Sequence, residues 1–180
     1  MPDNTRLSSS VTVKRYRELQ GADDRLALGR FVVERFEERY LRPVEDSPSK
    51  HGFTVLAVAC LAIEALESFY QGRADTKHAS AQMFRDFFGR DTPLKVFAGG
   101  NDWFYKDIRC GLLHQAEARG GWLIRRGGPL LDRAARTINA TAFLREVRRA
   151  VGTYARQLEV DDECWERFQD KMKAVCANCG

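Results

Sequence analysis

The sequence predicts an all-α helical bundle that carries one small β-hairpin. Two observations lead to this fold class. Apolar residues recur at helical spacing along most of the chain, and residues 122–131 combine two short apolar runs with a Gly-Gly-Pro turn, the usual pattern of a hairpin. With 180 residues, of which 44% are apolar, the chain is expected to form a single domain over 1–180 around its own hydrophobic core.

The amphipathic pattern assigns the helices of the bundle. Asp23 or Asp24 is suited to cap a first helix that runs to about Leu41, because its side-chain oxygen can accept a hydrogen bond from the first helical turn. Residues 53–70 are apolar on nearly all sides, so they are expected to form the central, buried helix. The other helices are expected to be a Phe-rich segment that ends at Gly89, a motif helix from Asn101 or Asp102 to about Arg119, an amphipathic segment over 143–158, and a last helix from Asp161 or Asp162 to about Val175.

The remaining segments are expected to be turns, extended pieces or termini. The hairpin follows the motif helix, and 136–143 is expected to add an extended piece whose Asn139 or Thr141 caps the next helix. Residues 91–100 favour a short helical turn or a loop. The terminal segments are expected to be a loose arm over the first twelve residues and a tail over 176–180.

Composition indicates a cytoplasmic protein without a membrane segment. The longest apolar run, 53–63, is too short to cross a bilayer, and the polar start lacks the apolar core of a signal peptide. Five irregularly spaced cysteines are expected to be free thiols. Cys176 and Cys179 have the spacing of two metal ligands, but a zinc site needs four, so we expect no metal and no cofactor.

Positive charge is concentrated in the second half of the chain. The net charge is +4, but residues 119–156 hold nine arginines, no lysine and only two acidic residues. Arginine clusters suit bidentate contact with phosphates or carboxylates, although a solvated helix face would have a similar composition. We expect Arg119, Arg125 and Arg126 to guide RNA by charge. Trp122 is either a core or interface aromatic or a platform for stacking a base.

Arg109 and His114 are the candidate catalytic residues, and they are separated by four residues. On a regular helix their directions differ by about 140°. A joint role therefore requires the arginine to wrap round the helix, or a groove shared with another helix or another subunit. Histidine changes protonation near neutral pH and arginine holds phosphates, which is enough for metal-free RNA cleavage through the 2′-hydroxyl.

Two other interpretations of this segment stay open. Cys110 shares a helix face with His114 and could be a nucleophile, although the C-terminal end of a helix disfavours a thiolate. His114 could also be a favourable charge at a helix end. Glu64 and Glu67 either orient Arg109 or His114 from the central helix, with Glu64 better placed, or mark the exposed edge of that helix.

The segment "YKDIRCGLLHQAE" resembles the Arg-x4–6-His signature of the HEPN superfamily, small all-α domains found in many ribonuclease toxins and defence proteins. The segments "VLAVACLAIEALESFYQG", "MFRDFFG", "GGWLIRRGG" and "INATAFLREVRRAV" are similar, in this order, to a bacterial, often plasmid-borne branch. This resemblance covers roughly residues 50–158. It implies a HEPN-like helical bundle in which Arg109 and His114 are catalytic. Cys110 stands where many active members carry Asn, Asp or His.

The resemblance also implies an activity and partners. Active members pair two motifs in the shared cleft of a homodimer and cleave RNA without metal, which leaves a 2′,3′-cyclic phosphate. We therefore expect a metal-independent endoribonuclease of a bacterial defence or toxin–antitoxin system, with RNA, a second copy and an antitoxin or defence-system protein as partners. The superfamily contains non-catalytic members as well, so the alternative is a module that binds a protein or nucleic acid through the same face.

Overall fold

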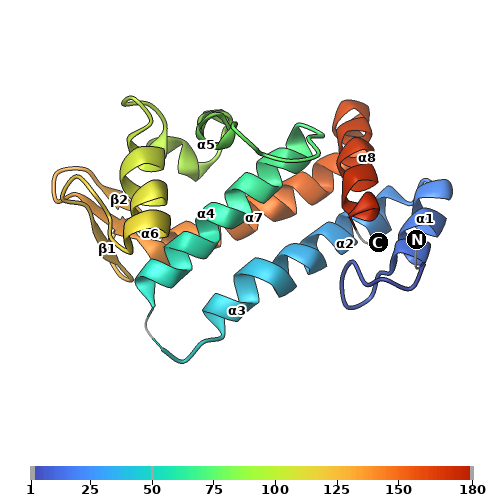
Figure 1. Cartoon of the computed structure of the whole chain (residues 1–180), viewed down its shortest axis with the longest axis horizontal. Helices are drawn as coiled ribbons and strands as arrows, with labels where there is room; N and C mark the ends of the chain where they lie inside the picture. The colour runs from blue at the N-terminus through green and yellow to red at the C-terminus, as the bar shows by residue number, and fades with distance from the viewer. Residues whose placement is uncertain (1–2, 50, 179–180) are drawn as a thin grey trace.

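Two long helices, α4 (Gly52–Tyr70) and α7 (Ala140–Val160), run side by side through the middle of the computed structural model, which describes residues 3–49 and 51–178 (Figure 1). α2 (Arg25–Phe36) packs along α7. The other α-helices are α1 (Val13–Gly21), α3 (Arg42–Glu45), α5 (Ser80–Gly89), α6 (Cys110–Gln115) and α8 (Asp162–Ala177). The predicted mainly helical fold is confirmed.

α4 is the core helix of this fold. Ala59, Ile63 and Leu66 are fully buried against its neighbours, as the apolar pattern predicts. By length and composition this helix of 19 residues could span a membrane, but 61% of its most apolar window is buried inside the protein. The apolar stretch of α4 is thus longer than the run over residues 53–63, and most of it packs inside the protein.

Three helices begin at predicted caps. The side chains of Asp24, Asn139 and Asp161 each accept a hydrogen bond from the backbone N–H three residues ahead, at 3.0 Å in all three cases. These contacts start α2, α7 and α8. A capping side chain acts only on its own first turn, so the signal is local and can be found in the sequence.

Two π-helical turns interrupt the regular helices. Glu37–Leu41 continues α2, and Phe104–Arg109 precedes α6. A further 3₁₀ turn forms over Pro93–Phe97, which agrees with the expected helical turn or loop. π-Helical turns are rare and are often found at functional sites. The second one carries Arg109, so the motif helix is irregular at its key residue.

The N-terminal segment differs from the expected loose arm. Leu7 is fully buried, and its carbonyl oxygen accepts hydrogen bonds from Arg35 and Arg39 at 2.6 and 3.0 Å. The unpredicted helix α1 follows it. The isolated Leu7 and Val11 lack helical periodicity, so only the tertiary structure reveals that they join the core.

The expected C-terminal tail is shorter than predicted. α8 continues through Ala177, and Cys176 is buried within it. Cys179, the second cysteine of the pair, lies outside the described residues.

The sheet has three strands in the order β1–β3–β2, where the sequence predicts a hairpin. β1 (Leu123–Arg125) pairs in parallel with β3 (Thr137–Asn139), and β2 (Leu131–Asp132) pairs with β3 in antiparallel orientation. The predicted pairing of the two segments that flank the Gly-Gly-Pro turn is wrong, because β3 lies between them. The extended piece expected over 136–143 is this central strand.

The close approach of α2 and α7 predicts an effect of Gly29→Ala. A Cβ atom at residue 29 would lie 2.8 Å from the backbone oxygen of Ala155. Backbone cannot move aside as a flexible side chain does, so we expect a loss of about 1–3 kcal/mol in the free energy of unfolding. Urea denaturation monitored by circular dichroism measures it.

Gly152→Ala is the matched control on the facing helix. The nearest neighbour of a Cβ atom there is the Arg156 Nη1 atom at 3.8 Å, an ordinary contact. Alanine favours a helix interior, so this variant should gain about 0.5–1 kcal/mol. Equal stability of the two variants would contradict the packing described.

Candidate functional site

The motif helix is shorter and less regular than predicted. Neither Asn101 nor Asp102 caps it, since both have positive φ, 55° and 62°, and the first turn has no side-chain cap. α6 ends at Gln115, where Ala116 adopts the left-handed conformation with φ of 55°. Arg119, the expected end, therefore lies beyond the helix.

The chain that follows α6 folds back over it. A Cβ atom on Gly111 would lie 2.4 Å from the carbonyl oxygen of Glu117, so only glycine fits there. The Arg119 backbone N–H donates to the carbonyl oxygen of Asp107 at 2.8 Å. This reversal places Arg119 next to the π-helical turn and leaves His114 on the outside of a short helix.

Arg109 is fixed by a buried carboxylate of α4. Its Nε donates to Glu64 Oε1 at 2.7 Å, and the two side chains are only 14% and 9% exposed. Glu64 Oε2 accepts a further hydrogen bond from Ser80 at 3.0 Å. Burial acts to lower the pKa of Arg109, but the bond and charge of Glu64 outweigh it and raise that pKa. Arg109 is thus a permanent, oriented cation.

His114 lies in a different environment. It is exposed near the C-terminal end of α6, and no hydrogen bond or ion pair joins it to Arg109 within the part of the chain that the structure describes. Arg109 packs inward against α4, whereas His114 faces solvent. The chain therefore holds the pair on different sides, as helix geometry predicts.

Cys110 lies between these residues and is half-buried. Its backbone N–H donates to the carbonyl oxygen of Tyr105, five residues back, which closes the π-helical turn. Burial raises the pKa of the Tyr105 hydroxyl, and the neighbouring Cys110 adds to the increase. Among the described contacts none joins Cys110 to His114, so the nucleophilic-cysteine interpretation gains no support.

Positive charge remains unneutralised at the sheet end of the molecule. Within the described residues, no carboxylate forms an ion pair with the five arginines that we call the basic end: Arg119, Arg125, Arg126, Arg133 and Arg136. By contrast, Arg148 on α7 binds both Glu37 and Glu45. α6 and the sheet lie together at this end, opposite α1 and α8 (Figure 1). The surplus charge is therefore located near the motif.

Trp122 is half-buried at the same end. Its ring stacks on Trp103 with 4.3 Å between centroids and 24° between planes. The guanidinium of Arg133 lies 5.4 Å from the Trp103 ring. One face of the Trp122 ring is thus covered by Trp103. Only the opposite face remains on which a base could stack.

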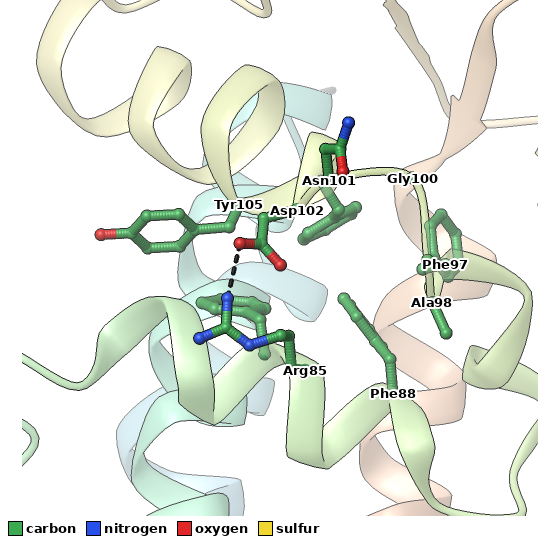
Figure 2. Close-up of a pocket in the computed structure, with 11 residues that line it drawn as sticks. Arg85, Phe88, Phe97, Ala98, Gly100, Asn101, Asp102 and Tyr105 are labelled. Carbon is green, nitrogen blue, oxygen red and sulfur yellow. Dashed lines mark hydrogen bonds and ion pairs between the residues drawn. The ribbon is translucent and has the colours of Figure 1, made fainter.

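Sequence reasoning missed a pocket of about 540 Å³ that Tyr105 helps to line (Figure 2), and the guanidinium of Arg109 lies 5.5 Å from the centroid of the same ring. Residues of α5, the 97–102 loop and the π-helical turn line it, and Arg85 and Asp102 form an ion pair of 2.5 Å there. The sequence signal was the "GGND" segment between aromatic residues. It matches no nucleotide-binding pattern, so the sequence alone does not predict this pocket.

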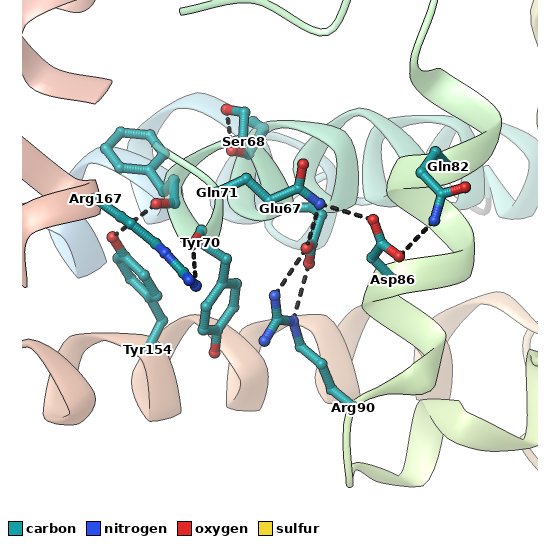
Figure 3. A network of polar contacts seen from close by, with 11 residues as sticks. Glu67, Ser68, Tyr70, Gln71, Gln82, Asp86, Arg90, Tyr154 and Arg167 are labelled. Carbon is teal, nitrogen blue, oxygen red and sulfur yellow. Dashed lines mark hydrogen bonds and ion pairs between the residues drawn. The ribbon is translucent and has the colours of Figure 1, made fainter. Parts of the chain in front are cut away.

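The second carboxylate of α4, Glu67, is fully buried, so the exposed-edge interpretation of these two residues is wrong. Arg90 donates two hydrogen bonds to it, at 2.8 and 2.9 Å, and Gln71 bridges Glu67 and Asp86 (Figure 3). Arg90 also lies 3.6 Å from the centroid of Tyr70. This network attaches α5 to α4, and α5 carries both Ser80 and Arg85 of the site.

Comparison of the chain with protein-family models, curated proteins and solved structures gives no match. The chemistry of the site therefore follows from its own contacts. They provide an oriented cation, an exposed histidine, a basic surface and an aromatic pocket at one end of the molecule.

The Arg109–Glu64 pair predicts an asymmetric response to mutation. Arg109→Ala leaves Glu64 buried without its cation, and we expect a loss of about 3 kcal/mol in the free energy of unfolding. The double variant Arg109→Met, Glu64→Gln buries no charge and should lose less than the single one. Urea denaturation compares them.

Arg125→Ala is the control for this comparison. Arg125 is exposed and has no carboxylate partner within the described residues, so its removal should change stability by no more than about 0.5 kcal/mol. A double variant less stable than Arg109→Ala would show that the buried Glu64 carboxylate does not need Arg109 to offset the cost of its burial.

Proposed function

We propose that this protein is a metal-independent endoribonuclease that acts as a homodimer in bacterial defence or a toxin–antitoxin system in the cytoplasm. The observation that carries the proposal is the fixed guanidinium of Arg109, five residues before an exposed His114. The ion pair with Glu64 uses Nε, and the N–H groups on the two Nη atoms lie outside that pair. A phosphate could accept bonds from them.

RNA supplies its own nucleophile in this mechanism. The 2′-oxygen attacks the phosphorus, the bond to the 5′-oxygen breaks, and a 2′,3′-cyclic phosphate and a 5′-hydroxyl result. His114 accepts the proton of the 2′-hydroxyl and, once protonated, supplies a proton to the departing 5′-oxygen. Arg109 stabilises the charge that builds up on the phosphate, and the basic end attracts the RNA backbone.

A homodimer would bring the two sides of the motif together. A two-fold axis near α6 lets each subunit face the other with the same surface, so the exposed His114 of one subunit can approach the Arg109 side of the other. Leu113 and Leu123, which are 38% and 47% exposed, are large apolar residues on α6 and β1. The proposed dimer interface would cover these side chains.

One observation favours a non-catalytic alternative. Arg109 is largely buried and paired with Glu64, which is also what a purely structural arginine would show. In that case the basic end would bind a protein partner or nucleic acid without cleaving it.

The proposal predicts loss of RNA cleavage in two variants. With a chelator present, the parent should cleave RNA, and His114→Ala and Arg109→Lys should each cleave it at least about 100-fold more slowly. Lysine keeps a cation beside Glu64, so folding is maintained while bidentate phosphate contact is lost. Gel analysis of labelled RNA measures the rates.

His51→Ala is the matched histidine control. His51 is exposed beside the start of α4, and its side chain makes no capping bond, so cleavage should be unchanged. Cleavage that persists in His114→Ala, or a parent that binds RNA but leaves it intact, would favour the binding module.

A shared cleft predicts complementation between inactive variants. When His114→Ala and Arg109→Lys subunits are mixed and allowed to exchange, mixed dimers hold one intact Arg109 and one intact His114 in the same cleft. We expect the mixture to recover activity that neither variant has alone, and light scattering should give the mass of a dimer. A monomer, or a mixture as inactive as its components, would refute the shared cleft.

A further inference from the structure

We propose that the pocket beside Tyr105 binds a guanine base, so that the enzyme selects RNA at a guanine nucleotide. The substrate class rests on the proposed ribonuclease function, whereas the pocket and its base recognition can be tested without cleavage.

The pocket shares one residue with the candidate catalytic centre. Tyr105 lines it, and the guanidinium of Arg109 lies 5.5 Å from the centroid of the same ring. A nucleotide whose base contacts Tyr105 in the pocket would therefore have its phosphate in the neighbourhood of Arg109.

The walls of the pocket are aromatic and fixed in advance. Phe88 and Phe104 contact each other edge to face with 5.0 Å between centroids, and Phe97 packs on Phe104 at 5.2 Å. All three are no more than 2% exposed, so they form a floor held by the core. The volume of about 540 Å³ lies within the usual range of small-ligand sites. Of the aromatic residues that line the pocket, only the half-buried Tyr105 has appreciable exposed area, so a base would stack on Tyr105 while the phenylalanines support the floor.

An unusual loop forms the rim. Four consecutive residues, Gly99 to Asp102, have positive φ values of 84°, 65°, 55° and 62°. Two of them are not glycine, and such a backbone persists only where the surrounding structure holds it. Glycine at 99 and 100 keeps the rim thin, and the turn brings the Asp102 side chain to the mouth.

The polar groups at the mouth match the edge of guanine. Asp102 Oδ2 pairs with Arg85 Nη1 at 2.5 Å, and in Figure 2 the other carboxylate oxygen points away from Arg85, toward the side where Phe88 lies. An ionised carboxylate only accepts hydrogen bonds. Guanine presents two adjacent donors, N1–H and N2–H, with the acceptor O6 beside them. Asp102 would accept from the two donors. Arg85 already donates to Asp102 and to Gln82, and one of its remaining N–H groups would donate to O6.

The other bases fit this pair less well. Adenine and cytosine place a ring nitrogen that is an acceptor next to their amino group, and uracil flanks its single N–H with two carbonyl oxygens. A carboxylate that bonds to any of these donors would face an acceptor as well. Unpaired polar groups of this kind are the usual cause of strong discrimination between similar ligands.

Nucleotide titration of the intact protein tests the proposal. Isothermal calorimetry with GMP, AMP, CMP and UMP should give at least tenfold tighter binding of GMP. Asp102→Asn should weaken GMP binding at least tenfold and leave AMP binding nearly unchanged. Asparagine tolerates positive φ and keeps the shape of the side chain, so the variant should fold, which circular dichroism checks. Asp91→Asn, an exposed aspartate outside the pocket, is the matched control and should bind GMP as the parent does.

Failure of this proposal can be told apart from failure of the nuclease. Equal affinity for the four nucleotides, no binding at millimolar concentration, or GMP binding that is unaffected by Asp102→Asn would overturn the guanine pocket, even if RNA is cleaved. GMP binding that depends on Asp102 in a protein that never cleaves RNA would support the pocket and refute the nuclease. In an active enzyme, cleavage products should also map to guanine positions and lose this preference in Asp102→Asn.

Discussion

The arrangement of this protein depends on two carboxylates that α4 buries among apolar residues. Glu64 and Glu67 are 7% and 0% exposed, and a buried carboxylate is costly unless a cation and hydrogen bonds accompany it. Arg109 meets this need at Glu64 and Arg90 at Glu67. The two ion pairs attach different segments, the motif helix and the end of α5, to the same core helix. The positions of the candidate catalytic arginine and of the pocket wall therefore follow from one requirement, the neutralisation of the two buried carboxylates of α4.

The π-helical turn determines what surrounds Arg109. In such a turn the backbone bonds join residues five apart, so side chains at that spacing come nearly into line, as those four apart do in an α-helix. Cys110 thereby lies next to Tyr105, whereas regular geometry would separate them by about 140°. Regular α6 then begins, and it carries His114 round to the solvent side. The change from one helix type to the other thus divides the motif into an inward, fixed part and an outward, accessible part.

Local signals in the sequence predicted much of the fold. Caps at Asp24, Asn139 and Asp161 and the apolar pattern of α4 depend on neighbouring residues only, so they could be read directly. The central place of β3, the packing of residues 3–12 and the π-helical turns depend on distant contacts, which periodicity does not contain. The same division holds for the site. Arg109 and His114 were found as a motif and Glu64 as a candidate partner, but the pocket required segments brought together by folding.

Tyr105 connects the two halves of the proposed site. Its ring lines the pocket, lies 5.5 Å from the guanidinium of Arg109, and packs on Phe84 with 5.9 Å between centroids. Phe84 belongs to α5, which Glu67 and Arg90 hold against α4. A change in the position of α5 would consequently move the pocket wall and Tyr105 together, and with Tyr105 the environment of Arg109. The proposed base site and the candidate catalytic arginine are thus connected through packed side chains of α5 and the π-helical turn.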